Sequence, residues 1–103
     1  MVAITTSHSG PYKTKSAADS VRFVKAWVKD KNIDIISPQL YSSGNEAAPE
    51  FAETSSCKSA GCTWSLYKGY KGKFVPSLAV DSHYPATQKF FKDKYGMTTA
   101  GFF

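Results

Sequence analysis

The arrangement of short apolar and β-branched runs along the chain is the sequence feature that most restricts its fold. Four runs are expected to form strands: 2–6, a run that starts at Ile33 and has Pro38 near its end, 74–80, and 97–103. Longer segments with helical period or turn-forming residues separate these runs, so the predicted order is βαβαβαβ. That order predicts an α/β domain with parallel strands and right-handed crossover helices packed on the sheet.

The first helix has the clearest pattern. Ser16 is a typical N-cap residue, and Asp19 follows it three positions later. Behind this cap, apolar residues repeat at helical spacing: Ala17, Val21, Val24 and Val28. We therefore expect a helix from residue 17 to about residue 31. Further helices are expected at three places: around 49–54, over 63–70, and from Pro85 to a terminating Gly96.

Two parallel architectures are compatible with this order. One is a small open α/β sheet. The other is a section of a (β/α)8 TIM barrel, in which the loops at the carboxyl ends of the strands hold the active site. After the first strand, the sequence SHSGPY has a single glycine where a dinucleotide-binding fold has G-x-G-x-x-G. Nucleotide binding therefore loses most of its support, and the barrel section is favoured.

The charge pattern argues against a nucleic-acid partner. The net charge of +5 comes from thirteen Lys and Arg against eight Asp and Glu, but only one of the basic residues is an arginine. They are scattered along the chain, whereas nucleic-acid surfaces cluster basic residues and use arginine for bidentate contacts. No apolar run approaches the roughly 20 residues that cross a membrane, so no membrane partner is expected either.

Cys57 and Cys62 are the only two cysteines, and they lie in the short run CKSAGC. A disulfide could close this loop, and free thiols remain the alternative. Because such a disulfide is typical of secreted proteins, we expect the protein to be extracellular or in the secretory lumen. His8 and His83 lie far apart in the sequence with no second ligand beside either, so no metal or other cofactor is expected.

Three polar residues at the ends of predicted strands form the candidate binding site. Gln39 and Tyr41 alternate at the end of the second strand, so they face the same side of it, which in a barrel would be the interior. Asp81 follows the third strand, where it can bind a hydroxyl group or cap the loop. We predict that Gln39, Tyr41 and Asp81 bind substrate; packing of the tyrosine ring under a loop is the alternative for Tyr41.

Four stretches of the chain resemble strands of the glycoside hydrolase family 18 barrel, the chitinase family. IDIISPQLY is similar to the sixth strand, where a Gln/Met-x-Tyr type of ending places a tyrosine at the base of the sugar site. VAITTSHSGPY is similar to the fifth strand and its loop, KFVPSLAV to the seventh strand, and MTTAGFF to the eighth. The resemblance implies that residues 1–103 are a single segment, the carboxyl-terminal half of such a barrel.

The resemblance has one large gap. The family's catalytic signature, D-x-x-D-x-D-x-E, is not found among these 103 residues, and Glu46, Glu50 and Glu53 are not expected at the end of a strand. We therefore expect no catalytic residue in this segment. The resemblance implies a protein that binds or hydrolyses N-acetylglucosamine-containing polysaccharide, with the remainder of the barrel or a second copy as partner. The alternative is a non-catalytic chitinase-like lectin or structural extracellular glycoprotein.

Overall fold

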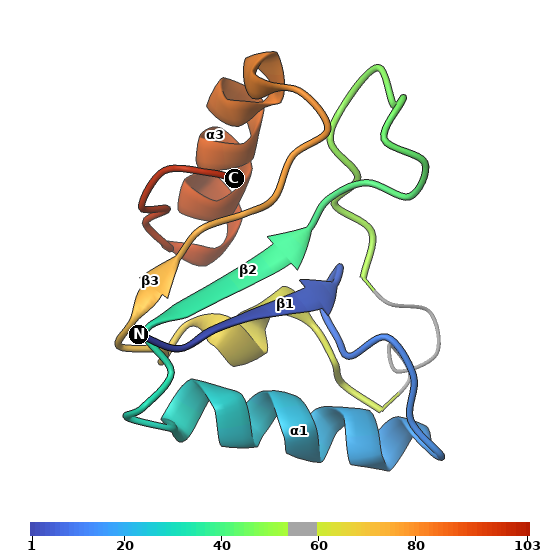
Figure 1. Ribbon diagram of the computed structural model, residues 1–103, viewed down its shortest axis with the longest axis vertical. Coiled ribbons are helices and arrows are strands. Elements are labelled where there is room, and N and C mark those ends of the chain that lie inside the picture. The colour runs from blue at the N-terminus through green and yellow to red at the C-terminus, as the bar shows by residue number, and fades with distance from the viewer. Residues whose placement is uncertain (54–59) are drawn as a thin grey trace.

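Three parallel strands form the sheet in the computed structural model, which describes residues 1–53 and 60–103. The strands are β1 (Ala3–Ser7), β2 (Ile35–Gln39) and β3 (Lys73–Phe74), and they lie in the sheet in chain order (Figure 1). Ala3 is opposite Ile35 in the first pair, and Ile36 is opposite Phe74 in the second. The expected α/β class with parallel strands is therefore confirmed for the described part of the chain.

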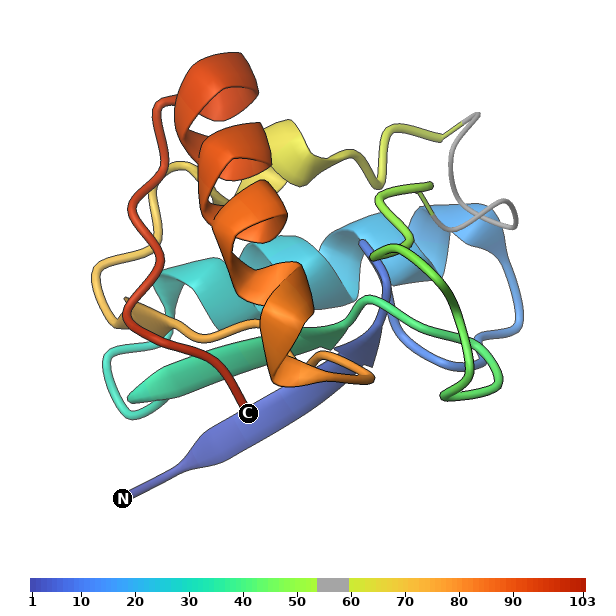
Figure 2. The ribbon, with the colours of Figure 1, turned by 90° about the horizontal axis from the view of Figure 1, so that it is seen from above.

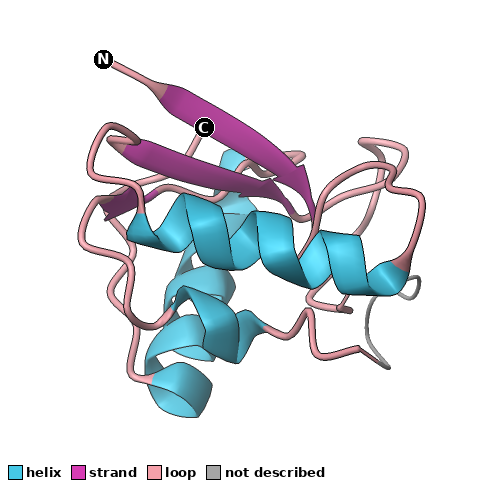
Figure 3. Ribbon diagram, turned by 90° about the horizontal axis from the view of Figure 1, so that it is seen from below, coloured by secondary structure: helices cyan, strands magenta, loops and turns pink. Residues whose placement is uncertain are grey.

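Helices cover one face of the sheet. The helical segments are α1 (Ala17–Lys29), η1 (Trp64–Tyr67), η2 (Asp81–His83) and α3 (Tyr84–Tyr95), where η marks a 3-10 helix. Figure 2 and Figure 3 show α1, η1 and α3 on the same side of the sheet. The sheet is thus singly wound, because its strands follow chain order and these helices stay on one side. Among the described residues, no helix is long and apolar enough to span a membrane.

The hydrophobic core lies between the sheet and these helices. Because side chains alternate along a strand, Ile36 and Leu40 point toward the helices, and both are fully buried. Residues of the helices and of the third strand region join the same cluster: Val24, Trp64, Tyr67, Phe74, Leu78 and Phe91. The opposite face of the sheet is more polar, since the hydroxyls of Ser37 and Ser77 hydrogen-bond there at 2.6 Å. One shared core therefore holds the helices to one side.

The predicted ends of α1 and α3 agree closely with the structure. Ser16 is the N-cap of α1, and its Oγ accepts a hydrogen bond from the Asp19 N–H at 3.2 Å. The helix ends at Lys29, slightly before the expected residue 31. At the other helix, Gly96 ends α3 with a φ of 64°, a left-handed conformation that glycine adopts without steric cost. Local cap chemistry thus sets these helix boundaries.

We expect Ser16→Ala to lower the free energy of unfolding by about 1 kcal/mol, because the Asp19 N–H would lose its acceptor at the start of α1. Ser82→Ala is the matched control: Ser82 is exposed, and its side chain makes no hydrogen bond within the described part of the chain. Urea denaturation followed by circular dichroism measures both variants. Equal losses in the two would show that the cap does not stabilise α1.

The strand predicted over 97–103 is not a regular strand, although this segment lies next to β3. The N–H groups of Ala100 and Phe103 donate to the carbonyls of the last β3 residue and of Pro76, both at 2.9 Å. The donors Ala100 and Phe103 are three residues apart, whereas the residues that accept from them are only two residues apart. The segment between the donors contains Gly101, which has a φ of 88°. This bulge-like irregularity prevents a continuous ladder.

Two predicted helices and the predicted third strand also differ from the structure. The helix expected over 63–70 is reduced to η1. Its two buried aromatic residues, Trp64 and Tyr67, are three positions apart, which is the repeat of a 3-10 helix. No helix forms over 49–53, and residue 54 lies outside the described residues. The strand expected over 74–80 is limited to β3, although the N–H groups of Val75 and Ser77 still donate to β2 carbonyls at 3.0 and 2.8 Å. The ladder is interrupted opposite Pro38 of β2, which has no N–H to donate in return.

Candidate functional site

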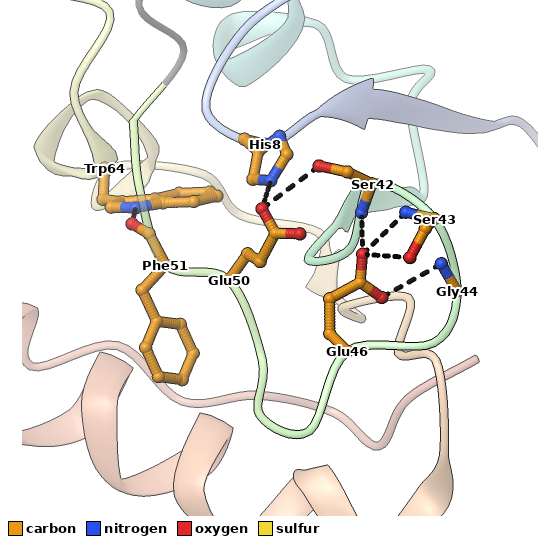
Figure 4. Close-up of polar contacts among 8 residues, drawn as sticks. All are labelled: His8, Ser42, Ser43, Gly44, Glu46, Glu50, Phe51 and Trp64. Carbon is orange, nitrogen blue, oxygen red and sulfur yellow. Dashed lines mark hydrogen bonds and ion pairs between the residues drawn. The ribbon is translucent and has the colours of Figure 1, made fainter.

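The loops that follow the three strands start at one edge of the sheet, which we call the carboxyl edge. Parallel sheets, whether open or closed into barrels, bind ligands at this edge because several loops can converge there on one ligand. The loops that follow β1 and β2 meet here, and Figure 4 shows the polar contacts between them. The carboxyl edge is therefore the candidate functional site.

Gln39 and Tyr41 both lie at the carboxyl edge, and both are half-buried. The side-chain oxygen of Gln39 accepts a hydrogen bond from the Tyr12 hydroxyl, and its backbone carbonyl accepts one from the His8 N–H at 3.2 Å. These bonds tie the end of β2 to the loop that follows β1. The Tyr41 hydroxyl has no hydrogen-bond partner among the described residues.

Asp81 stands apart from these two residues. It is the first residue of η2 and is exposed to solvent. Within the described ranges, no hydrogen bond or ion pair joins it to Gln39 or to Tyr41. The structure thus brings Gln39 and Tyr41 to one strand end but does not link Asp81 to them, and a sugar contact of Asp81 remains a prediction.

Glu50 is the residue of this edge that sequence reasoning missed. Its N–H donates to the Leu40 carbonyl at 2.9 Å, which brings the chain back to the end of β2. Its Oε2 lies 3.5 Å from His8 Nε2 and accepts a hydrogen bond from the Ser42 hydroxyl at 3.1 Å (Figure 4). Glu50 thus lies in the irregular segment after Tyr41, as the sequence indicated, and does not directly follow a strand. This segment folds back on the end of β2, which no periodic pattern in the sequence indicates.

The pair formed by His8 and Glu50 is partly open to solvent, with side chains that are 17% and 33% exposed. His8 Nε2 makes no hydrogen bond of normal geometry among the described residues, so its contact with Glu50 is an ion pair only when the imidazole is protonated. Because His8 Nε2 is itself buried, a ligand at this edge would contact Glu50 rather than this nitrogen, and a carboxylate can accept hydrogen bonds from sugar hydroxyls. The pair thus adds a polar contact surface to the carboxyl edge.

Three side-chain hydrogen bonds hold the loop that carries His8 in place. His8 has a φ of 56°, which is uncommon outside glycine, and its carbonyl accepts a hydrogen bond from the Thr6 hydroxyl at 2.7 Å. The buried Tyr67 hydroxyl donates to the Ser9 carbonyl at 2.8 Å, and the Ser9 hydroxyl donates to the Cys62 carbonyl at 2.7 Å. Burial raises the pKa of Tyr67 well above its ordinary value, so its hydroxyl stays protonated as a donor.

Glu46 closes the loop that follows Tyr41 around its own carboxylate. The N–H groups of Ser42 and Ser43 donate to Oε1 at 2.7 and 2.6 Å, and the N–H of Gly44 donates to Oε2 at 3.0 Å (Figure 4). The backbone hydrogen bond from Ser43 makes the largest contribution and lowers the pKa of Glu46 from 4.5 to about 2. The loop therefore keeps its shape without a ligand.

We expect Glu46→Gln to speed amide hydrogen exchange at Ser42, Ser43 and Gly44 at neutral pH, because the charged acceptor is lost. In the unmodified protein the folded-state pKa lies below 4.5, so this stabilisation is present above pH 4.5 and is lost as the pH falls toward 2. Side-chain NMR of Glu46 measures that titration, and Glu53→Gln is the control for exchange. A midpoint near 4.5 would contradict the arrangement.

The disulfide predicted between Cys57 and Cys62 remains a prediction, because Cys57 lies outside the described residues. Among the residues that the structure describes, no group of three or more His, Cys, Asp or Glu could hold a metal ion. His83 is buried in η2 rather than open at the carboxyl edge. The described site is thus made of hydroxyl, amide, carboxylate and imidazole groups, which suit a hydroxylated ligand.

Comparison with known proteins assigns no family to the chain. No family model matches it, and no curated protein and no solved structure matches it either. The class of protein is therefore defined by the fold and the carboxyl edge alone: a small, singly wound α/β protein with polar side chains at that edge.

Proposed function

We propose that the chain is the carboxyl-terminal half of a chitinase-like (β/α)8 barrel and that its carboxyl edge binds N-acetylglucosamine-containing polysaccharide. The observation that carries the proposal is the singly wound sheet, with α1, η1 and α3 on one face (Figures 2 and 3). A doubly wound sheet reverses its strand order and places helices on both faces. A barrel keeps one strand order and places its helices outside, which is the pattern of this sheet.

The face of the sheet away from the helices would line the interior of such a barrel. Ser37, Gln39 and Ser77 lie on this face by strand alternation, which makes it polar. Ser37 is buried and bonded to Ser77, so Gln39, which is half-buried at the strand end, is the side chain of the three that suits a sugar hydroxyl. Tyr41 follows at the strand end, and its hydroxyl is unpaired among residues 1–53 and 60–103. In the family that the chain resembles, the substrate's own acetamido oxygen attacks the anomeric carbon. We propose that the Tyr41 hydroxyl donates a hydrogen bond to that acetamido group.

Binding rather than hydrolysis is proposed for these 103 residues. Hydrolysis of this type needs an acid that protonates the leaving oxygen, and the family's acidic signature is not in the sequence. We propose that Glu50 contacts sugar hydroxyls beside Tyr41, while His8, whose buried Nε2 lies 3.5 Å from Glu50 Oε2, positions the carboxylate. A protein with this role works on polysaccharide outside the cell or in the secretory lumen. A chitinase-like lectin or structural glycoprotein is the alternative if no acid is supplied by a partner segment.

The first strand offers the edge at which such a barrel would continue. Within the described part of the chain, β1 pairs only with β2, apart from a local bridge between Ser7 and Gly10. An unpaired strand edge readily pairs with another strand. We propose that the remainder of a barrel or a second copy pairs here. Sedimentation equilibrium separates the two, because only self-pairing makes the average mass rise with concentration.

The test of ligand binding is an NMR titration of the isotope-labelled protein with a soluble N-acetylglucosamine tetramer. We expect saturable chemical-shift changes at Gln39, Tyr41 and Glu50, with little change at the opposite end of the strands. Tyr41→Phe should weaken binding roughly tenfold, because one hydrogen bond to the acetamido group is lost, while folding stability stays nearly unchanged. Cellotetraose, which lacks the acetamido groups, should bind more weakly.

Tyr95→Phe is the matched control for this titration, since it also removes a single hydroxyl but lies at the last residue of α3. Its affinity should equal that of the unmodified protein. Equal affinity in the Tyr41→Phe variant would remove Tyr41 from the site. Shifts confined to other surfaces, or no saturable shift at all, would overturn the proposed function.

A further inference from the structure

A surface cleft lies at the amino edge of the sheet, at the opposite end of the strands from Gln39 and Tyr41. Its volume is about 780 Å³. Its walls are the end of α1 with the turn that follows, the first residues of β2 and β3, and the turn before β3. Ligand sites for small molecules commonly have volumes of about 300–1,000 Å³. The cleft is therefore large enough for a ligand the size of a disaccharide.

Lysine side chains dominate the charge of this cleft. Four of them line it: Lys29, Lys31, Lys71 and Lys73. All four are exposed, and none belongs to an ion pair among the described residues. The two carboxylates of the lining, Asp30 and Asp34, each accept a backbone N–H at 2.8 Å, from Asn32 and Val2 respectively. The cleft thus carries more positive charge than its own acidic groups neutralise.

The walls of the cleft are held together before any ligand binds. The Tyr70 hydroxyl donates to the Ile33 carbonyl at 2.8 Å, and the Lys73 N–H donates to the Asp34 carbonyl at 2.8 Å. Tyr70 lies so close to Gly72 that a β-carbon there would collide with its ring. These contacts fix the two lysine-bearing turns relative to each other. A preformed site loses less conformational entropy when it binds a ligand.

We propose that this cleft binds a sulfated sugar of an anionic polysaccharide. The lining has no arginine, and lysine acts as a compact point charge that suits a sulfate group without the bidentate geometry of arginine. Tyr70 is the aromatic residue of the lining, and its hydroxyl end lies against Gly72 and donates to the Ile33 carbonyl. A nucleic acid bound in single-stranded form uses several aromatic faces and arginine, whereas this lining has one aromatic residue and lysines, so a sulfated glycan fits the cleft better.

The site is independent of the proposed function, because it lies at the other end of the strands and takes a differently charged ligand. Each titration reports on its own residues. Binding of an unsulfated N-acetylglucosamine tetramer at Tyr41 can fail while the sulfated sugar binds at the cleft, and the reverse outcome is equally visible. Failure of one proposal therefore does not decide the other.

The experiment is an NMR titration with a sulfated heparin disaccharide at low salt. We expect saturable shifts at Lys31, Lys71 and Lys73, and an affinity that falls as salt screens the charges. The triple variant Lys31→Gln, Lys71→Gln, Lys73→Gln should weaken binding roughly tenfold or more, since each change removes one charge contact. Lys29 is left unchanged because it lies in the last turn of α1 and interacts with the helix dipole.

The control is a second triple variant with the same change in net charge: Lys13→Gln, Lys15→Gln, Lys25→Gln. These lysines are exposed and do not line the cleft, so their loss should change the affinity less than twofold or so. Equal loss of affinity in both variants would mean that binding depends on the net charge of the protein and not on this cleft, and would overturn the proposed site. No saturable binding, or tighter binding of a single-stranded oligonucleotide through the same lysines, would overturn the sulfated-sugar proposal.

Discussion

Trp64→Ala is expected to lower the free energy of unfolding by about 3–5 kcal/mol. Trp64 is fully buried in η1, and its ring centre lies 5.1 Å from that of Phe91 and 5.8 Å from that of Tyr67. Its indole N–H also donates to the Phe51 carbonyl at 2.8 Å (Figure 4). The substitution would therefore open a cavity in the core and leave the Phe51 carbonyl without its partner.

Urea denaturation followed by circular dichroism measures this loss. Domains of this size have a total stability of about 5–15 kcal/mol, so a fraction of the variant could be unfolded even without denaturant. Phe23→Ala is the control, because Phe23 is 50% exposed on α1 and its loss should cost less than about 1 kcal/mol. If Trp64→Ala cost no more than Phe23→Ala, Trp64 would not be the centre of the core.

Gly72→Ala is expected to lower the free energy of unfolding by about 1–3 kcal/mol through overpacking. A β-carbon at Gly72 would lie 2.7 Å from the Asp34 carbonyl oxygen and would also collide with the Tyr70 side chain. The backbone oxygen cannot move without disturbing the start of β2. If Tyr70 moves instead, its hydrogen bond to the Ile33 carbonyl is lost.

Gly69→Ala is the matched control, since a β-carbon at Gly69 would meet no atom within 4 Å. Its effect should stay within about 0.5 kcal/mol. Thermal unfolding of both variants measures the difference, and the NMR shifts of Tyr70 report whether its ring has been displaced. Equal stability of the two variants would show that the turn before β3 is looser than the structure indicates.

The parts of the fold that local chemistry controls could be predicted from the sequence. The N-cap at Ser16 and the left-handed Gly96 each act on their own helix, so their patterns can be recognised without knowing the rest of the molecule. The order of β1, β2 and β3 along the chain could also be predicted, because apolar runs mark the strands and longer segments between them mark the crossovers. Gln39 lies at the carboxyl end of β2 for this reason.

The parts that depend on contacts between distant residues could not be predicted in this way. Glu50 lies at the carboxyl edge because its N–H donates a hydrogen bond to the carbonyl of Leu40, ten positions earlier in the chain. The carboxylate of Glu46 shapes the intervening loop by accepting three N–H groups, an arrangement with no periodic pattern. The length of β3 likewise depends on which of its residues lies opposite Pro38, and the sequence does not identify that pairing.

Strand order also has a consequence for how a sheet of this kind can grow. Each crossover places the next strand beside the last one, so β1 stays at one edge and β3, with residues 97–103 beyond it, stays toward the other (Figure 1). A further strand and helix can be added at either edge without moving a strand that is already paired. Tandem duplication of the gene segment would therefore lengthen the sheet rather than disrupt it, which gives a simple evolutionary route from a small sheet to a closed ring of strands.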